Sequence, residues 1–210
     1  MSMFLCSLLL TGTLNDPVNM NQSNASSVNT MQNVEVVILG GGCFWCIEAI
    51  FEELEGVKQV ESGYSGGWVD DPTYQQVCTG ETGHAEVVQI IFDPKIISLK
   101  EILRVFFTVH DPTTLNRQGA DVGTQYRSVI FYRNQEQRAV AGDVIQEIQT
   151  AKLWNASVVT EIVPFKAFYK AEDYHQKYYK MNPEQAYCRI IIDPKIRKFR
   201  ELYRNKLKRK

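Results

Sequence analysis

A strand, a glycine turn and a helix follow one another directly between residues 34 and 56, and this unit constrains the fold most. Residues 34–39, VEVVIL, form a continuous apolar run rich in β-branched side chains, which is typical of a strand buried on both faces. Three glycines follow, and apolar residues then recur with helical spacing from Cys43 until Gly56. The turn therefore presents Cys43 at the N-terminus of a helix.

The rest of the chain alternates strand and helix patterns. A capping box of Ser98 and Glu101 begins one helix, and Asn134 begins another. Further helices are expected at residues 171–180 and in the basic tail, and strands at residues 84–92, 126–132, 157–164 and 187–194. Residues 57–67 are expected to form a short strand that runs into a glycine-rich loop. Such alternation predicts an α+β or α/β two-layer sandwich, in which helices pack on a mixed sheet.

The first residues differ in composition from the rest. Residues 1–12 are apolar but lack a preceding Lys or Arg and a clear small-residue cleavage site, and they are too short to span a membrane. An Asn/Ser-rich segment follows. We therefore expect a disordered leader or a signal segment at residues 1–32 and one domain at residues 33–210.

The charges are nearly balanced, with 23 basic and 24 acidic residues and a net charge of −1. This balance gives no indication of a nucleic-acid partner. The Lys/Arg-rich run at residues 195–210 is the exception. The pattern favours a solvated amphipathic helix with Ile196, Phe199 and Leu202 facing inward over a nucleic-acid or membrane role.

The cysteines indicate thiol chemistry, because an odd and uneven set does not make a disulfide framework. They lie at positions 6, 43, 46, 78 and 188. The helix N-terminus favours the thiolate form of Cys43. Cys46, one helical turn later, is placed either to attack an oxidised Cys43 or to serve as a small core residue.

Two other classes of protein use a Cys-x-x-Cys pair. A zinc site needs a second pair of ligands, and Cys78 with His84 is a poor one, so no metal is expected. A thioredoxin-like disulfide exchanger needs a cis-proline strand facing the motif, for which the sequence has no convincing counterpart.

Polar residues gather in the expected loops, and their spacing alone does not assemble a site. They are Tyr64, Tyr74, His84, Glu86, His110, Asp111, Asp121 and Tyr126. Glu86 lies early in an otherwise apolar strand, where a carboxyl group is either exposed to solvent or buried and neutral. The strand pattern favours the solvent-facing position.

Four blocks resemble peptide methionine sulfoxide reductase, A type. They are GGCFWCIEAIF, GYSGGWVDDPTYQQVCTGETGHAEVVQIIFDP, HDPTTLNRQGADVGTQYRS and AEDYHQKYYKMNP. The resemblance covers residues 34–188 and implies a ferredoxin-like α+β core, no bound cofactor, and reduction of methionine S-sulfoxide, free or in proteins. It also implies that Cys43 attacks the sulfoxide sulfur.

The resemblance implies roles for the neighbouring residues too. Phe44 and Trp45 match the walls of the pocket for the substrate methyl group. Glu86 matches the proton donor, which requires a desolvated, protonated carboxyl group and reverses the solvent-facing expectation. The oxygen-binding tyrosines and their supporting aspartate fall on Tyr74, Tyr126 and Asp121.

The family regenerates the thiol through a second cysteine, and this sequence carries both candidates, Cys46 and Cys188. The segment around Cys188 has the pattern of a strand and a helix rather than a flexible coil, which favours Cys46 as the first resolving thiol. Cys188 then completes a relay or acts directly. The resemblance implies thioredoxin as the reductant, and with it a cytoplasmic monomer, with export as the alternative if residues 1–12 form a signal.

Overall fold

The computed structural model describes residues 34–209. The expectations for residues 1–32, including Cys6, lie outside the described residues. Along the described part of the chain, no helix is both long and apolar enough to cross a membrane.

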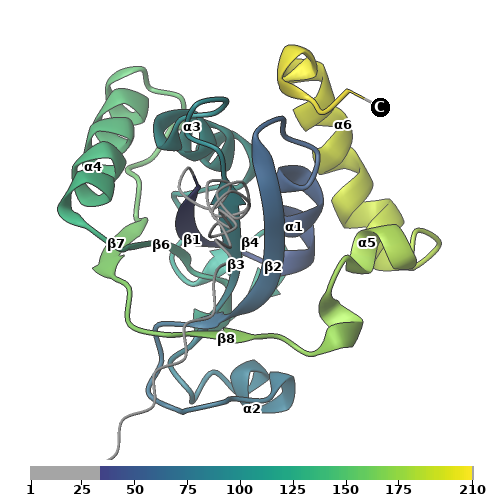
Figure 1. The fold of residues 1–210 in the computed structure, drawn as a ribbon. Coiled ribbons are helices and arrows are strands. Elements are labelled where there is room, and N and C mark those ends of the chain that lie inside the picture. The colour runs from purple at the N-terminus through teal and green to yellow at the C-terminus, as the bar shows by residue number, and fades with distance from the viewer. Residues whose placement is uncertain (1–33, 210) are drawn as a thin grey trace, which may run out of the picture. The chain divides into compact units, whose positions relative to one another are not determined.

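A six-stranded mixed sheet forms the centre of the fold (Figure 1). Its strands are β1 (Glu35–Gly41), β2 (Val57–Ser65), β3 (Ala85–Phe92), β6 (Ser128–Tyr132), β7 (Glu161–Pro164) and β8 (Phe168–Lys170). They lie in the order β7-β6-β1-β3-β2-β8, in which β6 and β7 are parallel and every other pair is antiparallel. A separate pair, β4 (Arg117–Gln118) and β5 (Asp121–Val122), lies in the long loop before β6.

The helices are α1 (Phe44–Phe51), α2 (Tyr74–Cys78), α3 (Leu99–Val109), α4 (Gln135–Thr150), α5 (Tyr178–Met181) and α6 (Asp193–Leu202). Four of the helices lie between strands and the last two follow β8, and α1, α3, α4 and α6 pack on one face of the sheet. Short 3₁₀ segments lie at Thr124–Tyr126, Asp173–His175 and Arg204–Lys206, and a π-helix lies at Cys188–Ile192.

The alternation of side chains along β1 separates two apolar clusters. Val37 and Leu39 belong to the larger cluster, together with side chains of α1, α3, α4 and α6. Ile38 faces the other way and packs with Val129 and Phe131 in a smaller cluster. Burying each such side chain stabilises the fold by about 1.5–3 kcal/mol. The predicted α+β arrangement of helices on a mixed sheet, and a first strand buried on both faces, are therefore confirmed.

Two helix starts lie where the sequence placed them. The Ser98 side chain accepts the backbone N–H of Glu101, and the Glu101 side chain accepts the backbone N–H of Ser98, which completes the capping box of α3. Asn134 caps α4 through the backbone N–H of Gln137, at 2.8 Å. These local signals need no tertiary context.

Two expected elements are wrong in type or extent. Residues 187–194 form no strand, because Cys188 and Ile192 are buried and Ile190 is exposed, a helical period that leads into α6. The helix expected at residues 171–180 is broken at Gln176, whose side chain binds the β2 backbone, and at Lys177, which has φ of +52°.

The C-terminal segment packs back onto α1. Ile196 and Phe199 are buried as predicted, whereas Leu202, the last residue of α6, is exposed. Beyond α6 the chain makes a β-bridge between Leu54 and Leu207. The tail therefore belongs to the folded structure rather than projecting from it.

Candidate active site

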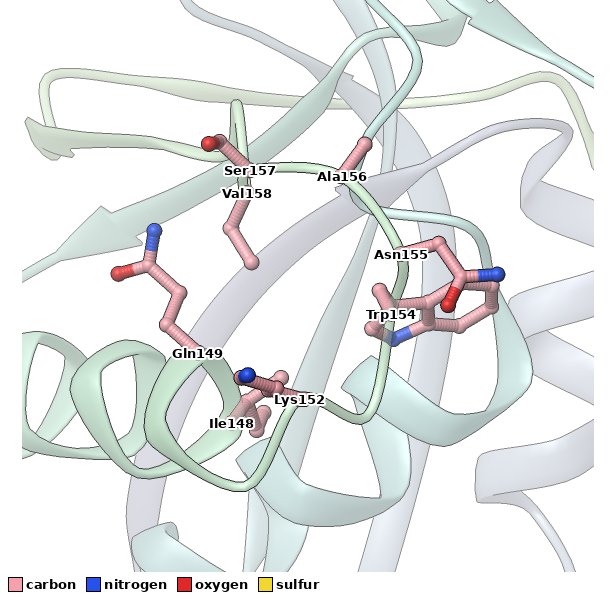
Figure 2. A pocket seen from close by; sticks show the side chains of 8 residues that line it. All are labelled: Ile148, Gln149, Lys152, Trp154, Asn155, Ala156, Ser157 and Val158. Atoms are coloured by element: carbon pink, nitrogen blue, oxygen red, sulfur yellow. The ribbon is translucent and has the colours of Figure 1, made fainter.

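One surface hollow of about 460 Å³ contains none of the residues that the sequence singles out (Figure 2). It lies at the end of α4 and the turn after it. Trp154 in its wall is held by a 3.2 Å hydrogen bond from its indole nitrogen to the Phe107 carbonyl oxygen. The chemistry-bearing side chains gather elsewhere, at the start of α1.

The glycine turn after β1 delivers Cys43 to the N-cap position of α1. Gly42 has φ of +95°, and a Cβ there would lie 2.5 Å from Cγ of Gln118, so a side chain is excluded on both counts. His110 supports the turn below Gly41, with its two ring nitrogens held by Phe106 and Ser128. The position of Cys43 is therefore fixed by packing around the glycines.

Cys43 and Cys46 form a buried pair of free thiols. Burial raises the pKa of Cys43, and the hydrogen bond with Cys46 raises it further, so the thiolate form expected for Cys43 from its place at the helix N-terminus is not favoured. The same hydrogen bond lowers the pKa of Cys46 to about 7 against the opposing effect of burial. The pair therefore loses one proton near neutral pH and keeps the second, with one sulfur stabilising the charge on the other.

Glu86 lies in β3 directly against this helix start. It is only 2% exposed, and its Oε2 atom accepts a 3.0 Å hydrogen bond from the backbone N–H of Phe44. Burial raises the pKa of Glu86 to about 8, although the Phe44 hydrogen bond opposes the shift. The solvent-facing position favoured by the strand pattern is wrong, because the side chain lies on the face of β3 that the start of α1 covers, where it contacts the Phe44 backbone.

Asp121 reaches the thiols through a residue that sequence reasoning missed. The Tyr187 hydroxyl donates a 2.9 Å hydrogen bond to Oδ2 of Asp121. Tyr187 also interacts with both thiols, and its hydroxyl lowers the pKa of Cys43 and of Cys46. The signal in the sequence is its position directly before Cys188, a candidate resolving cysteine.

Tyr74 and Tyr126 lie on separate short helices, and the hydroxyl groups of both lie within the electrostatic influence of Glu86. Burial raises the pKa of both hydroxyls, and the negative charge of Glu86 adds to each shift. Cys43 also raises the pKa of Tyr126. Both tyrosines therefore keep their protons at neutral pH and remain hydrogen-bond donors.

Phe44 and Trp45 lie in a group of aromatic rings. Phe44 is buried and its ring centroid lies 5.0 Å from that of His175. Trp45 is partly exposed and stacks on Tyr178 with 3.7 Å between ring centroids. An apolar surface of this kind suits a small alkyl group beside the thiol.

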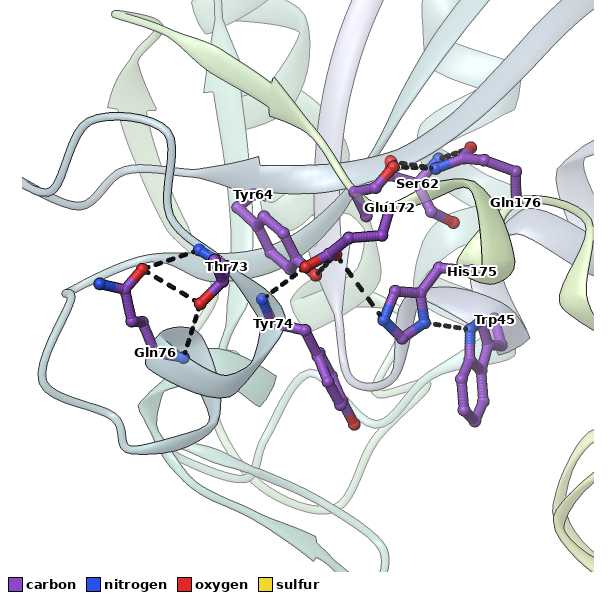
Figure 3. Close-up of polar contacts among 10 residues, drawn as sticks. Trp45, Ser62, Tyr64, Thr73, Tyr74, Gln76, Glu172, His175 and Gln176 are labelled. Carbon is purple, nitrogen blue, oxygen red and sulfur yellow. Dashed lines mark hydrogen bonds and ion pairs between the residues drawn. The ribbon is translucent and has the colours of Figure 1, made fainter.

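The loop at residues 171–176 adds polar contacts that the sequence did not reveal (Figure 3). Glu172 accepts hydrogen bonds of 2.9 Å from the backbone N–H of Tyr74 and from the Tyr64 hydroxyl. His175 accepts one of 3.1 Å from the indole N–H of Trp45. The resembling block AEDYHQ contains both residues, but no periodicity marked them out.

The two remaining described cysteines differ in accessibility. Cys188 is completely buried in the π-helix, and burial raises its pKa. Cys78 is exposed at the end of α2, where its thiol is hydrogen-bonded with the Tyr74 hydroxyl. His84 holds its own loop through the Val69 carbonyl oxygen and the Gly67 N–H. Within residues 34–209, no three His, Cys, Asp or Glu side chains are grouped to hold a metal ion.

Comparison with known proteins gives a consistent result. Residues 35–207 match the family model described as peptide methionine sulfoxide reductase. The chain is 57% identical to the peptide methionine sulfoxide reductase MsrA of Saccharolobus solfataricus, over 83% of this chain and 98% of that protein. It is 51% identical to the MsrA of Deinococcus radiodurans, over 89% of this chain and 91% of the other.

Solved structures agree. The reduced form of Mxr1 from Saccharomyces cerevisiae superposes with a TM-score of 0.68 at 35% identity, over 74% of this chain and 90% of that one. Methionine sulfoxide reductase A of Corynebacterium diphtheriae gives a TM-score of 0.66 at 34% identity, over 74% and 78% of the two chains.

Proposed function

The chain belongs to the peptide methionine sulfoxide reductase family of oxidoreductases, and from that premise we propose that it reduces methionine S-sulfoxide, free or in proteins, with Cys43 as nucleophile. Repair of oxidised proteins is the corresponding role. The observation that carries the proposal is the direct contact between the helix start bearing Cys43 and the buried carboxyl group of Glu86. Removal of oxygen from a sulfoxide requires a nucleophilic thiol and, next to it, a carboxyl group that can donate a proton.

In the proposed chemical step, the Cys43 thiol passes its proton to the Cys46 thiolate and its sulfur attacks the sulfoxide sulfur, while Glu86 gives its proton to the sulfoxide oxygen. As the sulfur–sulfur bond forms, the sulfur–oxygen bond of the substrate breaks and the oxygen leaves as hydroxide. This hydroxide attacks the Cys43 sulfur, the sulfur–sulfur bond breaks with its electron pair on methionine, and Cys43 is left as a sulfenic acid. The hydroxyl groups of Tyr74 and Tyr126 donate hydrogen bonds to the oxygen as its negative charge develops.

The remaining site residues support this step. Phe44 and Trp45 form the wall for the substrate methyl group, which the ring contacts around Trp45 support. Asp121 acts through its hydrogen bond from Tyr187, which in turn interacts with the thiols.

Recovery of the enzyme needs a second thiol. We assign it to Cys46, which already shares a hydrogen bond with Cys43 and attacks the sulfenic acid to form a disulfide with loss of water. Cys188 then completes a relay by exchange with that disulfide. Thioredoxin, as the family's reductant, returns the dithiol, and this dependence favours a cytoplasmic location. We further propose that the protein acts as a monomer.

We also propose a ferredoxin-like classification for the core and a domain that begins near residue 33. The strand order β6-β1-β3-β2, with α1 and α3 as the two crossover helices, supports the classification. The family match from residue 35 supports the domain boundary.

Turnover of the separate S and R diastereomers of a methionine sulfoxide peptide, with dithiothreitol as reductant, tests the function. We expect reduction of the S form and no turnover by the Cys43→Ser variant. Equal activity of that variant would contradict the mechanism, and an inactive wild-type protein would contradict the function itself.

A further inference from the structure

We infer that Tyr174 is a specificity-determining residue, which contacts the residue next to methionine sulfoxide in a peptide and, together with Glu172, favours a positively charged neighbour such as Arg. This role rests on the proposed function and adds the class of peptide that the site favours. An exposed aromatic ring at the rim of the site, the rings that connect it to the thiols, and an unpaired carboxylate beside it support the assignment.

Tyr174 presents an aromatic ring to solvent next to a buried residue of the site. It is 56% exposed, whereas the following residue, His175, is only 1% exposed. Both belong to the short 3₁₀ segment Asp173–His175, between β8 and α5. A tyrosine that is held on one side and open on the other offers a large contact area to a ligand at little cost in side-chain entropy.

A continuous group of rings connects Tyr174 to the start of α1. The ring centroid of Tyr174 lies 4.1 Å from that of His175. The His175 centroid lies 5.0 Å from that of Phe44 and 4.5 Å from that of Tyr74. A single ring therefore separates Tyr174 from the residue after Cys43. Because an extended chain advances by about 3.3–3.6 Å per residue, a long side chain next to the bound sulfoxide is within reach of Tyr174.

Glu172 supplies a negative charge beside this ring. Its two oxygens accept hydrogen bonds of 2.9 Å from the backbone N–H of Tyr74 and from the Tyr64 hydroxyl (Figure 3). Burial acts to raise the pKa of Glu172, but these hydrogen bonds hold it below its usual value, so the carboxyl group is ionised at neutral pH. Its side chain is 32% exposed, which leaves the charge accessible to a ligand.

The charge of Glu172 is not compensated by a cation. The nearest basic side chain, His175, lies 3.9 Å away, but burial lowers its pKa and its Nδ1 atom accepts the Trp45 indole N–H, so the ring is neutral. Among the partners of Glu172 within residues 34–209, none is a Lys or Arg side chain.

The charges around Tyr174 therefore have a net negative sign. Burial raises the pKa of the Tyr174 hydroxyl, and the charge of Glu172 raises it further, which shows that the two groups are close. The neighbouring Asp173 is already paired with Lys170, at 3.3 Å. A cation above Tyr174 meets both an aromatic face and a free carboxylate. Since each contact is weak at an exposed site, we expect a preference of roughly three- to tenfold.

The test uses the full-length protein and three peptides that differ only in the residues on either side of methionine S-sulfoxide, which are Arg, Leu or Glu. The wild-type protein should have a kcat/KM about three- to tenfold higher for the Arg peptide than for the Leu peptide. The Glu peptide should be the poorest substrate, because its charge is repelled. Free methionine S-sulfoxide serves as the reference substrate without neighbours.

Three variants and one control separate the contributions. Tyr174→Phe keeps the ring and should keep the preference. Tyr174→Leu keeps an apolar cover over His175 but has no aromatic face, and Glu172→Gln keeps an acceptor oxygen but has no charge. Each of these two should reduce the ratio of the Arg and Leu peptides to about twofold or less. The control is Leu153→Ala, an exposed position beside the hollow at the end of α4, which should keep the wild-type ratio.

The ratio also distinguishes a contact with substrate from a structural effect. A variant that merely displaces His175 lowers kcat/KM for both peptides alike and leaves their ratio unchanged. An unchanged ratio in Tyr174→Leu would thus overturn the role of Tyr174, and so would equal kcat/KM values for the two peptides in the wild-type protein, which need no variant to fold. Absence of turnover of every peptide and of free methionine S-sulfoxide by the wild-type protein would instead overturn the proposed function.

Discussion

Oε2 of Glu86 accepts the backbone N–H of Phe44 at 3.0 Å, so a carboxyl group on the central sheet is bonded to the residue next to the nucleophilic thiol. The carboxyl group of Glu86 is thereby held at one position relative to Cys43.

Substitution Glu86→Gln should slow the single-turnover reduction step by about 100-fold or more at pH 7, because the amide cannot supply a proton. It keeps an oxygen acceptor for Phe44, so the melting temperature should change little. Rapid-mixing experiments that follow loss of free thiol measure the step. Glu61→Gln on β2 is the matched control, and an equal effect there would show that the loss is not specific to the acid.

The pH profile of the same step should be bell-shaped. The rate should rise through about pH 7, because the thiol pair loses its first proton at the pKa of Cys46. It should fall through about pH 8, because Glu86 then ionises and can no longer donate a proton. In Glu86→Gln the falling limb should disappear while the rising limb stays. A variant profile that still falls near pH 8 would assign the acid limb to another group.

A third prediction concerns stability and a different carboxyl group. Glu48 is buried in α1, and burial raises its pKa to about 7. The folded protein therefore favours the protonated form of Glu48. The contribution of this form to the free energy of unfolding is complete below about pH 4.5 and is lost as the pH rises through about 7. Glu48→Gln should remove up to about 3 kcal/mol of this pH dependence of the free energy of unfolding.

Urea unfolding at several pH values between 4.5 and 8.5 measures that slope. The exposed Glu55→Gln variant is the control and should keep the wild-type dependence. A Glu48→Gln protein that loses stability with pH as steeply as the wild type would show that Glu48 is ionised in the folded state.

The first disulfide formed after one turnover should join Cys43 and Cys46. Cys188 is completely buried in the π-helix and needs a local opening before its sulfur reaches another thiol. Peptide mass mapping after one equivalent of substrate identifies the link. Cys188→Ser should form it at the wild-type rate and Cys46→Ser should not, with the exposed Cys78→Ser as control; a first link between Cys43 and Cys188 would reverse the order.

Tyr187→Phe should shift the pH midpoint of thiol alkylation upward by about one unit, because the lost hydroxyl lowers the pKa of both thiols. Tyr179→Phe is the matched control, since its hydroxyl is bonded to Asp193. Equal midpoints for the two variants would exclude Tyr187 from thiol activation.

The sequence predicts best those features that depend on neighbours in the chain. The glycine turn that places Cys43 and the capping box at Ser98 are local, and both are found. Periodicity fails at residues 187–194, where an isoleucine-rich run has the composition of a strand but the burial pattern of a helix. There, packing against α1 decides the structure, and no short-range signal contains that information.

The site itself shows the same limit. The position of Glu86 became predictable only through the resemblance, because burial of a single carboxyl group depends on which element covers that face of the strand, here the start of α1. Tyr187 meets Asp121 across 66 positions of the chain, and Glu172 meets Tyr74 across 98. Contacts at such separations leave no periodic trace in one sequence.

The tail that packs against α1 also determines when the reactive centre is completed during synthesis. The helix that carries Cys43 and Cys46 is made early, whereas Tyr187, Cys188 and α6 come near the end of the chain. At roughly 5–20 residues per second, the ribosome needs on the order of ten seconds to pass from one to the other. For that time the two thiols lack their covering segment, so a nascent chain is more open to mispaired disulfides than the finished enzyme.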